Sequence, residues 1–234
     1  MDIRHLTGHV EYHEGWDLQR RTHESVRTGE RADTVFFLEH ASVYTAGART
    51  NKNEYPTDGT EVIKVDRGGK ITWHGPGQIV AYPIVALAKP FDVVEYVRTL
   101  EQAVMDVCAA LGVETMRVEG RSGVWVAADS PDVPEPRLER KVCAIGARVA
   151  KGVTMHGLAL NCDADLTAFD HIVPCGIPAE DADVTSLTAE AGRRITVDEV
   201  RPLLEAALIE RLGPLLVHEE TPSAAPAEVA VASA

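Results

Sequence analysis

The sequence has few cysteines, few aromatic residues and no long apolar run, and each shortage excludes a class of protein. Four cysteines among 234 residues, without a CxxC pair or a Cys/His cluster at zinc spacing, exclude a disulfide scaffold and a zinc-ribbon domain. No stretch approaches the roughly 18 uninterrupted apolar residues of a membrane-spanning helix. The first ten residues lack the apolar segment of a secretory signal, so we expect a cytoplasmic protein with free thiols.

Basic residues are scarce relative to acidic ones. The chain has 23 Lys and Arg against 36 Asp and Glu, a formal net charge of −13. Such a chain does not bind nucleic acid through its overall field, and an acidic partner would need a local basic surface. Because 45% of the residues are apolar, we expect one globular domain over residues 1–218, followed by a disordered tail at 219–234.

Local patterns predict the elements of an α+β fold. Strands are expected at 1–10, 34–38, 62–65, 79–87 and 123–128, and as a hairpin of 142–149 and 153–160 that turns at Lys151 and Gly152. Helices are expected at 14–27, 92–111 and 196–212. Residues 43–60 and 129–139 are typical of loops, and Pro83 indicates a sheet edge or a bulge. Because helices and strands do not alternate, we expect a mixed, largely antiparallel sheet flanked by helices.

A glycine-rich segment is the first candidate for ligand binding. Four glycines and a proline fall among the twelve residues Arg67–Gln78, RGGKITWHGPGQ. Glycine leaves the backbone bare, so a ligand can lie directly against it, although a tight hairpin with incidental glycines has the same pattern. The spacing matches neither a phosphate-binding loop nor a dinucleotide-binding fingerprint.

Two polar residues stand in otherwise apolar strands. Lys141 begins the strand RKVCAIGAR, where its side chain either reaches solvent or lies partly buried. His156 belongs to MHGLALNC, where a structural histidine is the alternative to a functional one.

The cysteines differ in their local setting. Cys108 lies on the apolar face of the helix predicted at 92–111, so we expect it in the core. Cys175 stands in IVPCGI, between a proline that stiffens the chain and a glycine that permits an unusual backbone angle. A cysteine in such a turn is poorly placed for packing and is a candidate nucleophile.

Taken in order, seven motifs resemble the lipoyl(octanoyl) transferase family over residues 10–212. The motifs are LEHASVYTAG, RGGKITWHGPGQ, GRSGVWV, RKVCAIGAR, HGLALN, IVPCGI and VTSL. Three departures are small: Ser42 stands where proline is common, Ala48 separates Gly47 from Arg49, and Trp73 replaces a common tyrosine.

The resemblance implies an acyltransferase with the fold of biotin and lipoate protein ligases. It would move an octanoyl group from octanoyl-acyl carrier protein to a lysine of lipoyl-dependent enzymes, as the first step of protein lipoylation. The acceptors would be lipoyl domains of 2-oxoacid dehydrogenase complexes and the H protein of glycine cleavage. No cofactor, metal, nucleic acid or membrane is implied.

The resemblance also assigns roles to residues. Cys175 would carry the acyl group as a thioester, and Lys141 would activate it, either as a base or by stabilising the thiolate. A thiol near its ordinary pKa of about 8.5 is only a few per cent ionised at pH 7, so such help matters. Backbone N–H groups near Gly146, Gly157 or Gly176 are candidates for the oxyanion site. The residues expected to line the acyl substrate are Arg67, Gly68, Gly69, Lys70, Ile71, Thr72, Trp73, His74, Ala144, Ile145, Gly146, Gly157, Leu158 and Ala159.

Two other functions fit part of this pattern. A lipoate or biotin ligase would keep Lys141 but would use ATP and need no cysteine at position 175. A non-catalytic acyl-binding module would keep the glycine-rich segment without requiring both Lys141 and Cys175.

Segment 137–151 holds five basic residues against one acidic residue. Because acyl carrier proteins are acidic, we expect a basic rim around the mouth of the acyl pocket that docks the carrier. Its members would be Arg137, Arg140, Lys141, Arg148 and Lys151, joined by Arg67, Lys70 and Arg121 if the fold brings their segments together.

Overall fold

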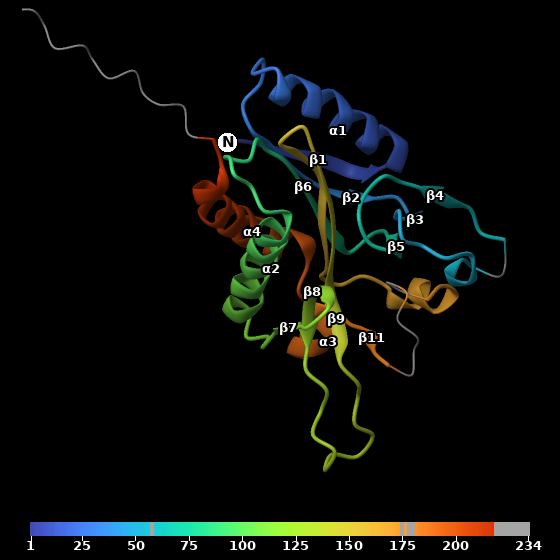
Figure 1. The fold of residues 1–234 in the computed structure, drawn as a ribbon. Coiled ribbons are helices and arrows are strands. Elements are labelled where there is room, and N and C mark those ends of the chain that lie inside the picture. The colour runs from blue at the N-terminus through green and yellow to red at the C-terminus, as the bar shows by residue number, and fades with distance from the viewer. Residues whose placement is uncertain (57–58, 174–175, 177–180, 218–234) are drawn as a thin grey trace, which may run out of the picture.

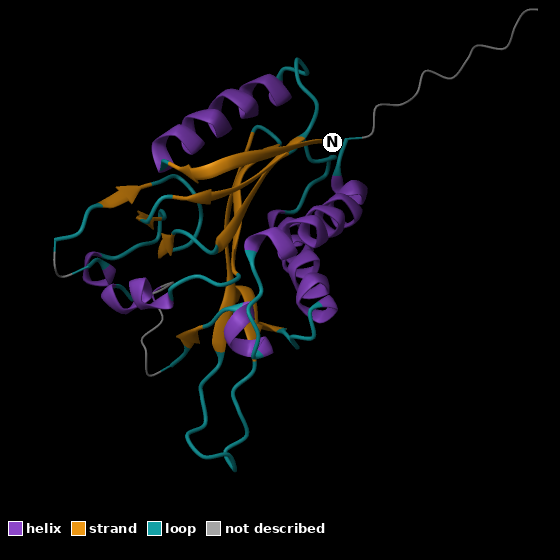
Figure 2. Ribbon diagram, turned by 180° about the vertical axis from the view of Figure 1, so that it is seen from behind, coloured by secondary structure: helices purple, strands orange, loops and turns teal. Residues whose placement is uncertain are grey.

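The computed structural model describes residues 1–56, 59–173, 176 and 181–217 (Figure 1). Cys175 and the tail predicted at 219–234 lie outside the described residues, and the extent of the domain to residue 218 stays a prediction. The described part contains a large sheet with helices on both faces and a smaller sheet beside it (Figures 1 and 2). This is the α+β arrangement predicted from the sequence.

The large sheet runs in the order β1-β2-β6-β10-β9-β8-β7, and β11 pairs with β9. Its strands are β1 (Asp2–Val10), β2 (Thr34–His40), β6 (Gln78–Ile84), β7 (Met116–Val118), β8 (Arg121–Val126), β9 (Arg140–Ala150), β10 (Val153–Asn161) and β11 (Asp183–Val184). The pairs β1–β2 and β9–β11 are parallel, and the remaining neighbours are antiparallel. The expectation of a mixed, largely antiparallel sheet is confirmed.

The predicted hairpin of β9 and β10 is confirmed. Lys151 and Gly152 form its turn with φ of 53° and 82°, the left-handed pair that a two-residue hairpin turn requires. At the other end of β9, the exposed loop 127–139 projects from the molecule (Figures 1 and 2).

The expectation that Pro83 marks a sheet edge is wrong. Pro83 lies in β6, which has β2 on one side and β10 on the other. The ladder between β6 and β10 ends at Ala81, so the missing N–H of Pro83 falls just beyond it. A β-carbon on Gly157 would lie 2.7 Å from the Pro83 ring and 2.2 Å from the carbonyl oxygen of Ala81. Glycine at position 157 therefore leaves the room that this proline needs.

Residues 43–60 are more regular than predicted. The smaller sheet has the order β4-β3-β5, with β3 (Val43–Ala46), β4 (Val62–Lys64) and β5 (Ile71–His74), and a 3-10 turn spans Lys52–Glu54. The strand predicted at 62–65 is confirmed as β4, whereas the sequence does not predict β3 and β5, because four residues carry little alternation. They are stabilised by an apolar cluster shared with the 3-10 helix Leu166–His171.

Helices cover the two faces of the large sheet with separate apolar clusters. Helix α1 (Tyr12–Arg27) packs on β6 and β10, and α2 (Val93–Ala110) and α4 (Val197–Leu212) cover the opposite face, with the short α3 (Leu187–Ala191) near the β9 edge (Figure 1). The carboxylate of Asp92 caps α2, and Cys108 is fully buried on it, as predicted. None of the helices in the described ranges is long and apolar enough to cross a membrane.

Candidate active site

A cavity of about 250 Å³ lies where the two sheets meet. One wall comes from β9 and β10 and the other from the glycine-rich segment that leads into β5. The lining residues are Tyr12, Arg49, Arg67, Gly69, Lys70, Thr72, His74, Tyr82, Gly120, Arg121, Ser122, Lys141, Ala144, Ile145, Gly146, His156, Gly157, Leu158 and Ala159.

Most residues predicted to line the acyl substrate reach this cavity, but Gly68, Ile71 and Trp73 do not. Side chains alternate along β5, so Thr72 and His74 face the cavity while Ile71 and Trp73 pack in the apolar cluster behind it. Gly68 is occupied by backbone contacts, since its N–H donates to Ala147 O. Whether the cavity residues bind substrate stays a prediction.

Sequence reasoning missed several lining residues. Gly120, Arg121 and Ser122 belong to the motif GRSGVWV, so a signal for them existed. Tyr12 and Tyr82 lie on α1 and β6 without any local motif, and only the packing of α1 on the sheet brings them to the cavity.

Arg67 holds the glycine-rich loop in shape. Its guanidinium donates to the carbonyl and hydroxyl oxygens of Thr45 at 2.9 and 2.8 Å and to the carbonyl oxygen of Lys70 at 2.9 Å. Arg67 is buried, so these bonds join the loop to β3 in a setting with little competition from water. Part of its contribution to the cavity is therefore structural.

Lys141 lines the cavity and is buried, so the alternative in which its side chain reaches solvent is wrong. Its ammonium lies 4.5 Å from the centre of the Trp125 ring, directly across the β8–β9 ladder. The bare backbone of Gly123 leaves space for the alkyl chain, because a β-carbon there would lie 3.3 Å from Lys141 Cε. Within the described residues the ammonium has no carboxylate partner.

Three of the four cysteines are unsuitable as nucleophiles. Cys108, Cys143 and Cys162 are fully buried, and burial raises the pKa of the Cys108 thiol to about 12 and also raises the pKa values of Cys143 and Cys162. A thiol that stays protonated is a poor nucleophile.

Gly176, the residue after Cys175, lies beside the cavity. Gly176 has a φ of 66° and donates its N–H to Val173 O at 2.9 Å, which joins the two sides of the segment. A β-carbon on Gly176 would lie 2.2 Å from Lys70 Nζ, so this glycine is in close contact with a cavity-lining lysine.

The aromatic end of the cavity has neutral rings at pH 7, and the Arg67 guanidinium lies near them. Tyr82 donates its hydroxyl to His40 Nε2 at 2.8 Å, because His40 Nδ1 donates to Val10 O. Burial lowers the pKa of His40 to about 4 and also lowers the pKa of His74, and it raises the pKa of Tyr12 to about 12. Beside these rings lie Leu158 and Ala159, so this end suits an apolar ligand.

His156 closes the cavity near Asp66. Its Nε2 lies 2.8 Å from Asp66 Oδ1, and burial lowers the pKa of the imidazole, so a neutral ring donates to the carboxylate at pH 7. The hydrogen bond from His156 is the main reason that the pKa of Asp66 falls to about 2. His156 therefore has a defined structural role in this corner.

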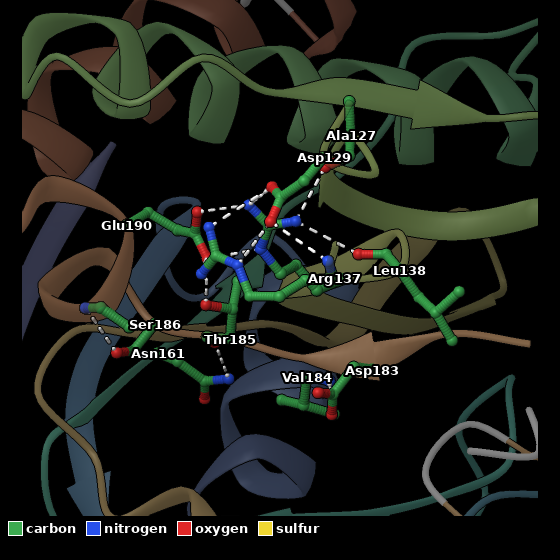
Figure 3. Close-up of polar contacts among 12 residues, drawn as sticks. Ala127, Asp129, Arg137, Leu138, Asn161, Asp183, Val184, Thr185, Ser186 and Glu190 are labelled. Carbon is green, nitrogen blue, oxygen red and sulfur yellow. Dashed lines mark hydrogen bonds and ion pairs between the residues drawn. The ribbon is translucent and has the colours of Figure 1, made fainter. Parts of the chain in front are cut away.

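The expected basic rim is wrong for three of its arginines. Arg148 pairs with Asp66, and Arg137 and Arg140 both pair with Asp129 and Glu190. Figure 3 shows Arg137, Asp129 and Glu190 gathered with Thr185 in one polar cluster. These charges tie the long loop to α3 instead of presenting a free basic surface.

Positive charge is instead concentrated in the cavity. Five lining residues are basic, namely Arg49, Arg67, Lys70, Arg121 and Lys141, and none of the lining residues, all from the described part, is acidic. Two of the five are paired with carboxylates outside the cavity, Lys70 with Glu54 and Arg121 with Glu139, so the excess of positive charge is smaller than this count.

Comparison with known proteins identifies the family of the chain. The family model described as the lipoyl protein ligase A/B catalytic domain matches residues 11–209. The chain is 58% identical over 207 residues to an octanoyltransferase of Salinispora tropica, covering 88% of this chain and 94% of the relative. It is 54% identical over 224 residues to an octanoyltransferase of Mycobacterium tuberculosis, covering 95% and 92%.

Solved structures agree on the fold. A bipartite lipoate protein ligase from Thermoplasma acidophilum, described with its E2 lipoyl domain, has a TM-score of 0.66 at 16% identity, covering 91% of this chain and 83% of that chain. A lipoate-protein ligase A bound with ATP has a TM-score of 0.62 at 16% identity, covering 96% and 90%. The chain therefore belongs to the lipoyl protein ligase A/B catalytic domain family and, within it, to the octanoyltransferases, which are acyltransferases of protein lipoylation.

Proposed function

We propose that the chain takes an octanoyl group from octanoyl-acyl carrier protein onto Cys175 and passes it to a lysine of a lipoyl-bearing protein. The acceptors would be lipoyl domains of 2-oxoacid dehydrogenase complexes and the H protein of glycine cleavage, and the reaction would be the first step of their lipoylation. The observation that carries the proposal is the buried Lys141 ammonium, which lines an otherwise acyl-compatible cavity and has no carboxylate partner among the described residues.

The first half-reaction exchanges one thioester for another. The Cys175 thiolate attacks the carbonyl carbon of the donor, the tetrahedral intermediate collapses, and the carrier's thiolate leaves and takes up a proton. A nearby ammonium raises the thiolate fraction of Cys175, and Lys141 is the candidate. Lys141 can equally serve as the group that accepts and returns the proton, and both roles need the same side chain in the same place.

The second half-reaction forms an amide. The neutral amine of the acceptor lysine attacks the thioester carbonyl, the Cys175 thiolate leaves, and the amine loses one proton. An amide is more stable than a thioester, so this half runs downhill without ATP. Of the suggested oxyanion donors, the N–H of Gly176 is already used by Val173 O, and Gly146 and Gly157 lie opposite each other in the β9–β10 ladder, where paired residues exchange their N–H···O bonds. None of the three therefore has an N–H directed at the cavity, and the oxyanion donor is left unassigned.

The cavity fits the acyl chain chemically. Tyr12, Tyr82, Leu158 and Ala159 line it at its aromatic end, where burial holds His74 and the adjacent His40 neutral. Burying the seven carbons beyond the carbonyl would contribute about 5 kcal/mol at ~0.8 kcal/mol per methylene. This free energy of burial depends on the length of the acyl chain, so the cavity would select acyl groups by their length.

Mass spectrometry tests the proposal. Purified protein mixed with octanoyl-acyl carrier protein, without ATP, should gain one octanoyl group on the peptide that contains Cys175. Cys175→Ala should abolish the adduct, and Cys162→Ala, which removes a buried thiol, should leave it. Transfer that requires free octanoate and ATP, with release of pyrophosphate, would instead identify a ligase.

A further inference from the structure

Glu54 is a buried carboxylate outside the cavity that no motif singled out. Its side chain is 4% exposed and accepts hydrogen bonds from Lys70 Nζ at 2.5 Å, from Asn51 N at 3.1 Å and from Asn51 Nδ2 at 3.2 Å. A buried carboxylate is tolerated only when it is paired in this way. The ion pair therefore links the 3-10 turn Lys52–Glu54 to the glycine-rich loop.

The same two residues contact both sides of the segment that carries Cys175. The carbonyl oxygen of Glu54 accepts the N–H of Val173 at 3.4 Å. The side chain of Lys70 packs against Gly176, since a β-carbon there would lie 2.1 Å from its Cδ and 2.2 Å from its Nζ. Val173 and Gly176 are themselves joined by a hydrogen bond of 2.9 Å.

We propose that Glu54 and Lys70 are positioning residues for acyl transfer, whose ion pair holds both ends of the Cys175 segment against the cavity. This inference rests on the proposed function, because it assumes that Cys175 is the residue to be placed. It reassigns Lys70 from direct substrate binding to placement of the nucleophile. Misplacing a reacting group by about 1 Å costs up to about a hundredfold in rate, so such a contact has a large effect.

The pair also balances charge beside Gly176. Glu54 neutralises the Lys70 ammonium, whereas Lys141 has no such partner among the described residues. Removing the charge of Glu54 leaves a second unpaired ammonium next to Gly176, while the cavity's other cations, Arg49, Arg67 and Arg121, are unchanged. Substitutions at Glu54 and at Lys70 should therefore both disturb the placement of Cys175, but they should shift the ionisation of its thiol in opposite directions.

The test compares Glu54→Gln, Lys70→Met and Lys70→Arg in the full chain. Two rates are measured: octanoylation of Cys175 by octanoyl-acyl carrier protein, and alkylation of Cys175 by iodoacetamide across pH, both followed by peptide mass spectrometry. Lys52→Met is the matched control, because it removes an exposed positive charge from the same 3-10 turn. Thermal unfolding reports whether each variant is folded.

Glu54→Gln should shift the midpoint of alkylation to lower pH yet slow octanoylation by about tenfold or more. Lys70→Met should shift the midpoint to higher pH and slow octanoylation similarly. Lys70→Arg, which keeps the ion pair, should stay within about threefold of the original chain, as should Lys52→Met. A purely structural pair would lower the melting temperature without moving the alkylation midpoints.

Octanoylation at the original rate in Glu54→Gln or Lys70→Met, or unmoved midpoints in both, overturns the inference. Failure of the proposed function has a different signature, because the unsubstituted chain would then form no octanoyl adduct on Cys175. The alkylation arm needs no acyl donor, so it still decides whether the pair acts on Cys175.

Discussion

Arg140 and Glu190 form a two-point ion pair, with Nε–Oε1 and Nη2–Oε2 distances of 2.7 and 2.8 Å and side chains that are 4% and 7% exposed. Arg140 immediately precedes Lys141 on β9, and Thr185, which donates its hydroxyl to Glu190, donates its N–H to Lys141 O. The pair thus anchors the edge of the sheet at which Lys141 enters the cavity.

Arg140→Met should destabilise the protein by about 3 kcal/mol, because the buried Glu190 carboxylate then keeps only the exposed Arg137 and the Thr185 hydroxyl as partners. Urea unfolding measures this change. Arg193→Met is the control, since Arg193 pairs with Glu199 on the surface and should contribute less than about 1 kcal/mol. A loss at Arg140 no larger than at Arg193 would show that the pair is not a structural anchor.

This pair also predicts a dependence of stability on acid. Burial opposes ionisation of Glu190, but hydrogen bonds from Arg140 and Thr185 outweigh it and lower the pKa of the carboxyl below its ordinary value of 4.5. The stabilisation is therefore complete above pH 4.5 and declines as pH falls below it. Arg140→Met should flatten this decline in the free energy of unfolding, and an unchanged slope would contradict the assignment.

Trp125→Leu should raise the midpoint pH of Cys175 alkylation or slow the alkylation itself, because the Lys141 ammonium loses the aromatic ring that holds it in place. A cation–π contact of this kind contributes about 0.5–2 kcal/mol. Trp125→Phe keeps an aromatic face and should behave more like the original chain. Equal effects of leucine and phenylalanine would indicate that packing, not the contact with Lys141, is what matters.

His156→Asn should raise the pKa of Asp66 from about 2 toward its ordinary value of 3.8, as followed by the ¹³C NMR signal of the carboxyl group. Asparagine is chosen because His156 has a φ of 58°, which asparagine tolerates. Arg148→Gln should shift the same signal less, since the hydrogen bond from His156 is the larger cause. The opposite ranking would contradict the role assigned to His156.

Ala159→Leu should shift the preferred acyl donor toward shorter chains by filling part of the cavity. Each methylene that no longer fits removes about 0.8 kcal/mol, or roughly a fourfold loss in kcat/KM for octanoyl relative to butanoyl thioesters. Rates with butanoyl thioester serve as the control for intact chemistry. An unchanged ratio would place the acyl chain elsewhere.

Local chemistry alone determined much of this protein. The turn at Lys151 and Gly152 lacks the asparagine that commonly precedes glycine in such turns. The predicted hairpin forms nevertheless, because the apolar strands on either side set its register. The cap at Asp92 and the apolar stripe of α2 placed Cys108 in the core as expected. The motif containing Lys141 was recognisable because a lysine in an apolar strand is unusual enough to be noticed in isolation.

Tertiary structure decided which charges are free. From the sequence, Arg137, Arg140 and Arg148 looked like one basic surface, but Asp129, Glu190 and Asp66 arrive from other segments and neutralise them. Glu54 gave no signal, because its importance depends on Lys70, Val173 and Gly176, which are distant in the chain. Ion pairs and cavities join residues across many positions, so a linear pattern reports the residues available while only the fold decides which of them meet.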